Sequence, residues 1–374
     1  MFSSEQLQKL IYPLIIEQVL AITVGTVDTV MISYAGESAM SGVSLVDMIN
    51  TLMINIFIAV STGGAVILSQ YLGSKNTKQA SKAASQLIMI STIIAVTFMI
   101  VFIFGNHFIL KLFFGAIEFD VMRNAKIYFL ISVCSYPFIA IFDSCSAIFR
   151  SMGDSKISME ISVGMNILNG IGNAILIFGF SMGVMGAALS TLFARIIGTI
   201  FIFILLDKRK NLVTISLKEI FTWDKEIICR ILYIGIPSGI ENGIFQLGRV
   251  LVVSIISTYG TAQIAANAVA NGLDSMGTIA GQAMNLAMLT VIGHCMGAEK
   301  KEEAVFYTKK LWKLTYQITF VINIAILVSL PLLLKLFSLS EEVYRYSYVL
   351  ILIHNGIAIF LWPTAFTMPN ALRA

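Results

Sequence analysis

One carboxylate lies well inside a long apolar stretch of this chain. Asp28 belongs to the stretch formed by residues 10–34. A charged side chain in a bilayer costs several kcal/mol unless it meets a partner or water. Asp28 is therefore predicted to be functional, because its carboxylate could bind a cation or exchange a proton.

Amide side chains follow one face of a later stretch, residues 157–180. Asn166, Asn169 and Asn173 have the i, i+3, i+7 spacing of a single helix face. Asn173 and Thr191, which lies early in the next stretch, are expected at about the depth of Asp28. The alternative role for these asparagines is hydrogen bonding between neighbouring helices. That role is favoured for Asn166, and the ion-binding role is favoured for Asn169 and Asn173.

Together these side chains would supply a carboxylate, amide carbonyls and a hydroxyl. Hard cations prefer such oxygen ligands, so the sequence predicts a site for Na+ or a proton at Asp28, Asn169, Asn173 and Thr191. Glu17 lies eleven residues before Asp28, about three helical turns away on the same face. Glu17 is therefore a further candidate site residue, because both carboxylates could face one cleft between the helices.

The elements that carry these residues are predicted to be membrane helices. Hydrophobic residues make up 57% of the chain and charged residues 12%, whereas soluble domains have about 25% charged residues. Apolar stretches of about twenty residues, enough to cross a bilayer, recur throughout. The predicted spans are 10–34, 43–72, 86–110, 126–149, 157–180, 185–206, 229–258, 264–296, 311–337 and 343–372.

The same pattern occurs twice, with a displacement of 224 residues. Pro13 corresponds to Pro237 (237 − 13 = 224). The same shift relates three further pairs: Glu17 and Glu241, Gly36 and Gly260, Gly73 and Gly297. Repeated helix bundles with interrupted helices and intramembrane carboxylates are typical of secondary transporters.

The repeat points to further candidates in the second half. Glu241 follows Pro237, whose ring loosens the helix, so Glu241 and Gln246 are predicted to form a substrate or proton site. The alternative for Glu241 is a buried acid bonded to a neighbouring hydroxyl or amide. Asp47 and Asp274 belong to repeat-related acid–amide pairs, Asp47 with Asn50 and Asn271 with Asp274, and are interpreted as packing or cleft-lining residues.

Positive charge gathers in alternate loops, as in Lys75, Lys78 and Lys82 and again in residues 208–210 and 300–310. By the positive-inside rule, the N-terminus and these loops are predicted to be cytoplasmic in a multi-pass plasma-membrane protein. The net charge of +4 gives no indication of nucleic-acid binding. The scattered histidines and cysteines predict no metal site of their own, and no cofactor is expected.

The domain organisation follows from the repeat. Residues 1–206 are predicted to form an N-terminal lobe of six helices, 207–228 a cytoplasmic linker, and 229–374 a C-terminal lobe. The turn that begins at Arg150 has its counterpart at Asn370–Arg373, close to the end of the sequence. About ten helices are therefore expected, with the second six-helix repeat incomplete and the chain either a fragment or truncated.

Several segments resemble the multidrug and toxic compound extrusion (MATE) transporters. Val27-Asp28-Thr29 is similar to the acidic motif of that family's first helix. Residues 169–179 resemble its fifth-helix pattern, residues 183–191 its sixth-helix entry, and residues 150–154 the turn after its fourth helix. The match covers the whole chain, although the family has twelve helices, so helices eleven and twelve are expected to be missing.

The resemblance implies an all-α integral membrane fold, with two parallel-repeat six-helix lobes facing each other across a central cleft. It implies antiport, in which organic, often cationic and lipophilic compounds leave in exchange for Na+ or H+. The family's cation site corresponds to Asp28, Asn169, Asn173 and Thr191, but several members have Asp where this chain has Asn173. The protein is expected to act as a monomer.

Three other functions are alternatives. A flippase for lipid-linked saccharides would favour a strongly basic cleft, whereas the spans here hold mainly Arg195 and Arg249 beside several acids. An intramembrane enzyme is disfavoured because the chain has no HExxH, GxSxG or paired-Asp motif. The third alternative is a non-functional truncated product.

Overall fold

The computed structural model describes residues 2–115, 118–208, 213–215, 217–335 and 339–374, and over these residues it consists of helices joined by short turns, without strands. The first half contains α1 (Ser4–Ser33), α2 (Glu37–Gly73), α3 (Thr77–Phe114), α4 (Phe119–Cys134), α5 (Tyr136–Ser151), α6 (Ser155–Asn173), the π-helix η1 (Ala174–Gly179) and α7 (Gly183–Lys208). The second half contains α8 (Leu217–Ile220), α9 (Lys225–Ser257), α10 (Thr261–Gly297), α11 (Lys301–Lys335), α12 (Glu341–Trp362), the π-helix η2 (Pro363–Thr367) and α13 (Met368–Arg373).

The predicted membrane architecture is confirmed. In the described part of the chain, eight helices are long and apolar enough to cross a membrane, or nine if one bent pair is a single span. That pair is α4 and α5, which meet at an angle of 45° within the predicted span 126–149. The remaining predicted span, 229–258, forms the 33-residue helix α9.

The 224-residue repeat appears in the backbone geometry. Helices α2 and α10 both have 37 residues, and their boundaries differ by that shift at each end (261 − 37 and 297 − 73). Gly36 and Gly260 begin the two helices with φ values of 107° and 128°, which favour glycine. Lys75 and Glu299, which follow the two helices, both adopt positive φ values, 60° and 58°. Residues related by the shift therefore make the same turns.

The two halves contact each other closely where α2 crosses α10. A Cβ atom built on Gly73 would lie 2.1 Å from the carbonyl oxygen of His294, and one on Gly297 would lie 1.8 Å from that of Gln70. Gln70 and His294 are themselves related by the shift (294 − 70). The crossing is thus pseudo-symmetric, and it requires glycine on both helices.

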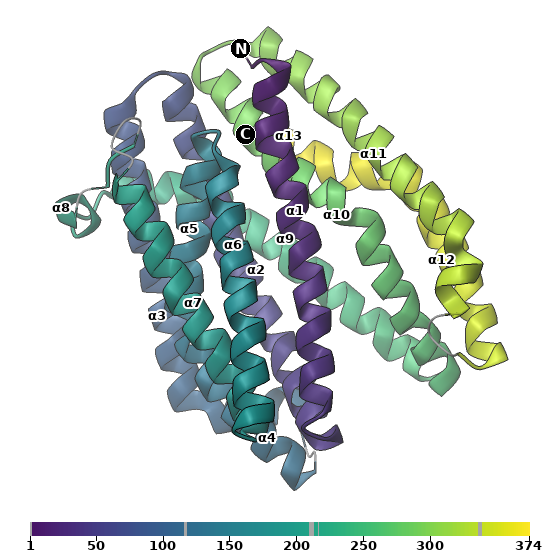
Figure 1. Cartoon of the computed structure of the whole chain (residues 1–374). Coiled ribbons are helices and arrows are strands. Elements are labelled where there is room, and N and C mark those ends of the chain that lie inside the picture. The colour runs from purple at the N-terminus through teal and green to yellow at the C-terminus, as the bar shows by residue number, and fades with distance from the viewer. Residues whose placement is uncertain (1, 116–117, 209–212, 216, 336–338) are drawn as a thin grey trace.

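Each half also packs against the opposite half through its first helix. Leu7, Leu10 and Leu14 of α1 share a buried cluster with residues of α10 and α11. Ile227, Ile228 and Ile231 of α9 join the cluster built from α2, α3, α5 and α7. Figure 1 shows α9 and α10 diverging from α1 toward the end of the molecule opposite the N-terminus. The halves are therefore joined near that terminus and separate away from it.

The predicted linker, 207–228, lies partly outside the described residues. Its described part contains the four-residue helix α8. The amide of Gln86 on α3 donates to the carbonyl oxygens of Glu219 and Thr222, at 2.8 and 2.6 Å. Lys82 pairs with Asp224, the N-cap of α9. These contacts hold the start of α9 against α3.

Candidate functional site

Asp28 lies on α1 opposite the C-terminal end of α6, where two asparagines converge on its carboxylate. The Nδ2 atom of Asn169 donates to both carboxylate oxygens, at 3.0 and 2.8 Å. The Nδ2 atom of Asn173 donates to Oδ1 at 2.8 Å. Because Asn169 and Asn173 are four residues apart, both amides lie on the same face of α6 and reach Asp28. We call this arrangement of Asp28, Asn169 and Asn173 the two-amide clamp.

A further group of hydroxyls from α7 holds Asn169. Thr191 donates to Asn169 Oδ1 at 3.2 Å, and it also donates to the carbonyl oxygen of Ala187. Thr191 is therefore linked to Asp28 through Asn169 and does not bond the carboxylate directly. Ser190 donates to the backbone oxygen of Asn169 at 2.7 Å and to its Oδ1 at 3.1 Å. Sequence reasoning missed Ser190, although it lies next to Thr191 in the segment that resembles the family's sixth-helix entry.

Close helix packing makes these contacts possible. A Cβ atom on Gly172 would lie 2.3 Å from Ser190 Oγ, so glycine at this position lets α7 approach α6. Asn169 and Asn173 are only 6% and 1% exposed. The π-helix η1 begins directly after Asn173, and such insertions are frequent at functional sites. The asparagines of the clamp are thus buried among packed helices, whereas Asp28 is half-buried.

The orientation of the amides decides what the clamp can bind. Both asparagines direct their NH2 groups, not their oxygens, at Asp28. The oxygen of Asn169 accepts from hydroxyls, and the buried oxygen of Asn173 has no hydrogen-bond partner. This arrangement stabilises an ionised carboxylate. The predicted Na+ ligands do come together, but it is the amide nitrogens of Asn169 and Asn173, not their oxygens, that contact the Asp28 carboxylate.

Glu17 and Glu241 occupy repeat-related positions with different partners. Ser158 donates to the carboxylate of Glu17, at 3.4 Å to either oxygen. Glu241 forms an ion pair with Arg373, and its side chain is 59% exposed. Arg373 of α13 is thus the partner of Glu241, in place of the hydroxyl or amide of the alternative interpretation.

Asp47 lies on α2, where Asn50 donates to its Oδ1 at 3.3 Å and the hydroxyl of Tyr136 donates to Asn50.

Arg195 of α7 donates to Ser135 at 2.6 Å. Among the described residues Arg195 forms no ion pair with Asp143, one oxygen of which is buried and without a hydrogen-bond partner. Its acceptor Ser135 lies at the bend between α4 and α5.

A polar cavity of about 800 Å³ lies in the second half and includes the predicted residues Gln246 and Asp274. His354 of α12 has its Nδ1 atom 3.0 Å from Asp274 Oδ1. Arg249 has its guanidinium 3.5 Å from the side-chain oxygen of Asn271. Asp274 is thus a cavity-lining residue, and sequence reasoning missed its partner, His354.

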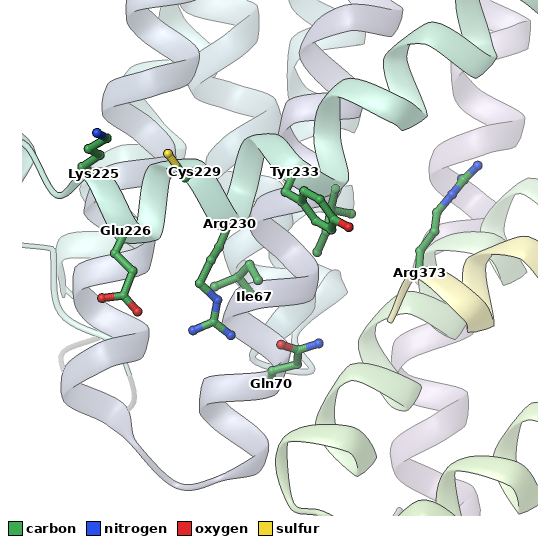
Figure 2. A pocket seen from close by; sticks show the side chains of 9 residues that line it. Ile67, Gln70, Lys225, Glu226, Cys229, Arg230, Tyr233 and Arg373 are labelled. Carbon is green, nitrogen blue, oxygen red and sulfur yellow. The ribbon is translucent and has the colours of Figure 1, made fainter.

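A second cavity, of about 830 Å³, lies between α2 and the first turns of α9. Figure 2 shows Glu226 and Arg230 on the same side of α9, with Ile67 and Gln70 of α2 nearby. The guanidinium of Arg230 donates to the hydroxyl of Tyr71 at 2.8 Å. This cavity adjoins the crossing of the two halves and contains none of the predicted site residues.

Comparisons with known proteins place the chain in a family. The MatE family profile matches residues 13–175 and 237–372, and its two matches begin 224 residues apart (237 − 13). The chain is 32% identical to the uncharacterized transporter YisQ of Bacillus subtilis over 300 residues, which cover 79% of this chain and 65% of that protein. It is 24% identical to the probable multidrug resistance protein NorM of Thermotoga maritima over 373 residues, which cover 99% of this chain and 79% of that protein.

Solved structures share the fold. A multidrug resistance MATE family transporter in an outward-facing conformation aligns with a TM-score of 0.92 at 20% identity, covering 99% of this chain and 82% of its own. A MOP superfamily transporter from Pyrococcus furiosus, described as having a binding pocket of reverse polarity, aligns with a TM-score of 0.91 at 21% identity and the same coverage. The expectation that the last two helices are missing is not supported by these comparisons. From the family profile, the relatives and the fold, the chain belongs to the MatE family of multi-pass membrane transporters.

Proposed function

We propose that this protein is a secondary antiporter that exports small organic compounds and uses Asp28 as its coupling-ion site. The observation that carries the proposal is the two-amide clamp on a carboxylate within a membrane helix. Intramembrane carboxylates are costly, and they mark ion and proton pathways. Two relatives are described as a multidrug export protein and a probable multidrug resistance protein, which supports export as the direction of transport.

The orientation of the clamp favours a proton over Na+ as the coupling ion. Each asparagine donates to Asp28, so binding of Na+ would require both amides to rotate and present their oxygens. Protonation of Asp28 requires no second ligand. It would weaken the hydrogen bonds that hold α1 to α6, because their acceptor would no longer be a charged carboxylate. Proton binding at Asp28 would thereby loosen the contact between these two helices, as alternating access requires.

The test is the charge-removing substitution Asp28→Asn. We expect it to abolish export of a fluorescent substrate from cells and from proteoliposomes, whether a pH or a Na+ gradient is imposed, while protein abundance stays unchanged. Asp120→Asn, at an exposed position in the first turn of α4, is the matched control and should transport normally. Wild-type efflux in the Asp28→Asn variant would refute the proposal.

We also infer that the protein lies in the plasma membrane with a cytoplasmic N-terminus. Basic residues such as Lys75, Lys78 and Lys301 follow closely after Gly73 and Gly297, where the two halves are in contact. The positive-inside rule places that end in the cytoplasm. The ends of α9 and α10 that diverge from α1 would then face outward.

A further inference from the structure

We propose that the polar cavity of the second half binds the anionic group of an aromatic organic substrate, with Arg249 as its direct partner. This inference rests on the proposed export function for its physiological meaning, but its test measures binding alone. It differs from the lipophilic cation that the family resemblance implies. The cavity is lined by side chains of α2, α9, α10 and α12 and of η2.

The charges in the cavity support an anionic ligand. The carboxylate of Asp274 has the imidazole of His354 at 3.0 Å. Among the described residues, no carboxylate lies within ion-pair distance of Arg249, whose nearest hydrogen-bonding partner is the neutral Asn271 at 3.5 Å. A guanidinium strongly prefers a carboxylate or phosphate acceptor. Arg249 is therefore the charge in this cavity without a matching partner.

The remaining polar groups suit a ligand with several hydrogen-bonding atoms. Amides line the cavity from three helices, and the buried side-chain oxygen of Asn285 has no hydrogen-bond partner in the part of the chain that the structure describes. Amides can donate and accept, so they match a polar compound better than an alkylated cation. The amide-bearing residues are Asn55 of α2, Asn242 and Gln246 of α9, and Asn267, Asn271, Gln282 and Asn285 of α10.

Aromatic side chains form one wall of the cavity. Trp362 stacks on Phe366 with ring centroids 5.2 Å apart, and Phe245 meets Phe366 edge-on at 5.5 Å. A Cβ atom on Gly281 would lie 1.9 Å from the indole of Trp362, so this glycine makes room for the ring. Flat rings of this kind favour an aromatic ligand. The cavity thus combines a cation without a matching partner, many amides and a ring-binding wall.

The test uses two nitroaromatic probes of similar shape and opposite charge, 4-nitrobenzoate and 4-nitrobenzyltrimethylammonium. Quenching of Trp362 fluorescence is measured in the purified protein with Trp223 and Trp312 replaced by Phe. We expect 4-nitrobenzoate to bind at least about tenfold more tightly than the ammonium compound, because a charge-assisted hydrogen bond forms only with the anion. Equilibrium dialysis with the otherwise unaltered protein provides a second measurement if the tryptophan variants do not fold.

Variants of Arg249 identify the partner of the anion. Arg249→Gln should weaken 4-nitrobenzoate binding about tenfold and leave the ammonium compound unaffected, and Arg249→Lys should restore part of the affinity. Arg345→Gln, at an exposed position near the start of α12, is the matched control and should bind as the parent does. Equal binding of both probes, or undiminished anion binding by Arg249→Gln, would overturn the inference. Either result would leave the role of Asp28 intact, because Asp28→Asn is scored by transport and not by this binding.

Discussion

At the scale of single residues, the identity of position 173 determines how many charges meet at the clamp. Asn173→Asp would place a second carboxylate beside Asp28 and remove the hydrogen bond of 2.8 Å that Asn173 donates. Two adjacent carboxylates repel each other unless a proton or a cation lies between them. The wild-type clamp, with one carboxylate and two amide donors, avoids that repulsion.

We expect Asn173→Asp to gain stabilisation by Na+. Thermal unfolding of the purified variant should shift upward in NaCl relative to KCl, because a ligand that binds only the native state stabilises it. The wild-type protein should show no such difference. Asn166→Asp, on the same helix but not bonded to Asp28, is the control. If Na+ does not stabilise the Asn173→Asp variant, adding one carboxylate is not sufficient to turn the clamp into a Na+ site.

At the scale of secondary-structure elements, the crossing of α2 and α10 depends on glycine. A Cβ atom at position 297 would lie 1.8 Å from a backbone oxygen, and backbone cannot rotate away as a side chain could. Gly297→Ala should therefore force the helices apart and destabilise the protein by about 1–3 kcal/mol. This loss would appear as a lower midpoint of thermal unfolding in detergent.

The control for this substitution lies on the same helix. Nothing lies within 4 Å of a Cβ atom built on Gly272. Gly272→Ala should therefore be neutral, or should stabilise the helix by up to about 1 kcal/mol. Equal loss of stability in both variants would mean that general helix effects, not the crossing, control the outcome.

The start of α9 should be sensitive to acid. The hydrogen bond from Lys82, reinforced by the backbone N–H of Ile227, holds the pKa of the Asp224 carboxyl below its ordinary value of 3.8. Because the folded-state pKa is the lower one, this stabilisation is present above the unfolded pKa and is lost as the pH falls through the folded-state pKa. A double-mutant cycle with Asp224→Asn and Lys82→Gln should give a coupling of at most about 1 kcal/mol at pH 7. The coupling should weaken as the pH falls below the ordinary pKa of 3.8 and through the lower folded-state pKa, and a coupling that stays constant on full acidification would contradict the assignment.

At the scale of the whole molecule, the orientation in the membrane can be tested through one native thiol. Cys229 is exposed near the start of α9, whereas Cys145 and Cys295 are buried and Cys134 is half-buried. A membrane-impermeant maleimide should label Cys229 in inside-out vesicles but not in intact cells. Cys229→Ser should abolish the labelling. Labelling in intact cells would reverse the predicted topology.

The sequence by itself determined the class of fold and the repeat. Long apolar stretches can satisfy their backbone groups in a bilayer only by forming helices, so composition and length were sufficient to predict the spans. The shift of 224 residues predicted equivalent turns because glycines at positive φ leave a local signature, as at Gly36 and Gly260. The carboxylate and amides at Asp28, Asn169 and Asn173 were recognisable for a similar reason, since polar residues in apolar stretches are conspicuous.

Only the tertiary structure decided which atoms of these residues meet. The sequence could not reveal that the amides donate to Asp28, that Ser190 holds Asn169, or that Arg373 neutralises Glu241. Each of these contacts joins different helices, and its geometry depends on helix rotation and distance, which hydrophobicity along the chain does not encode. The unmatched charge of Arg249 became visible for the same reason, because a partner's absence can be read only where the neighbours are known.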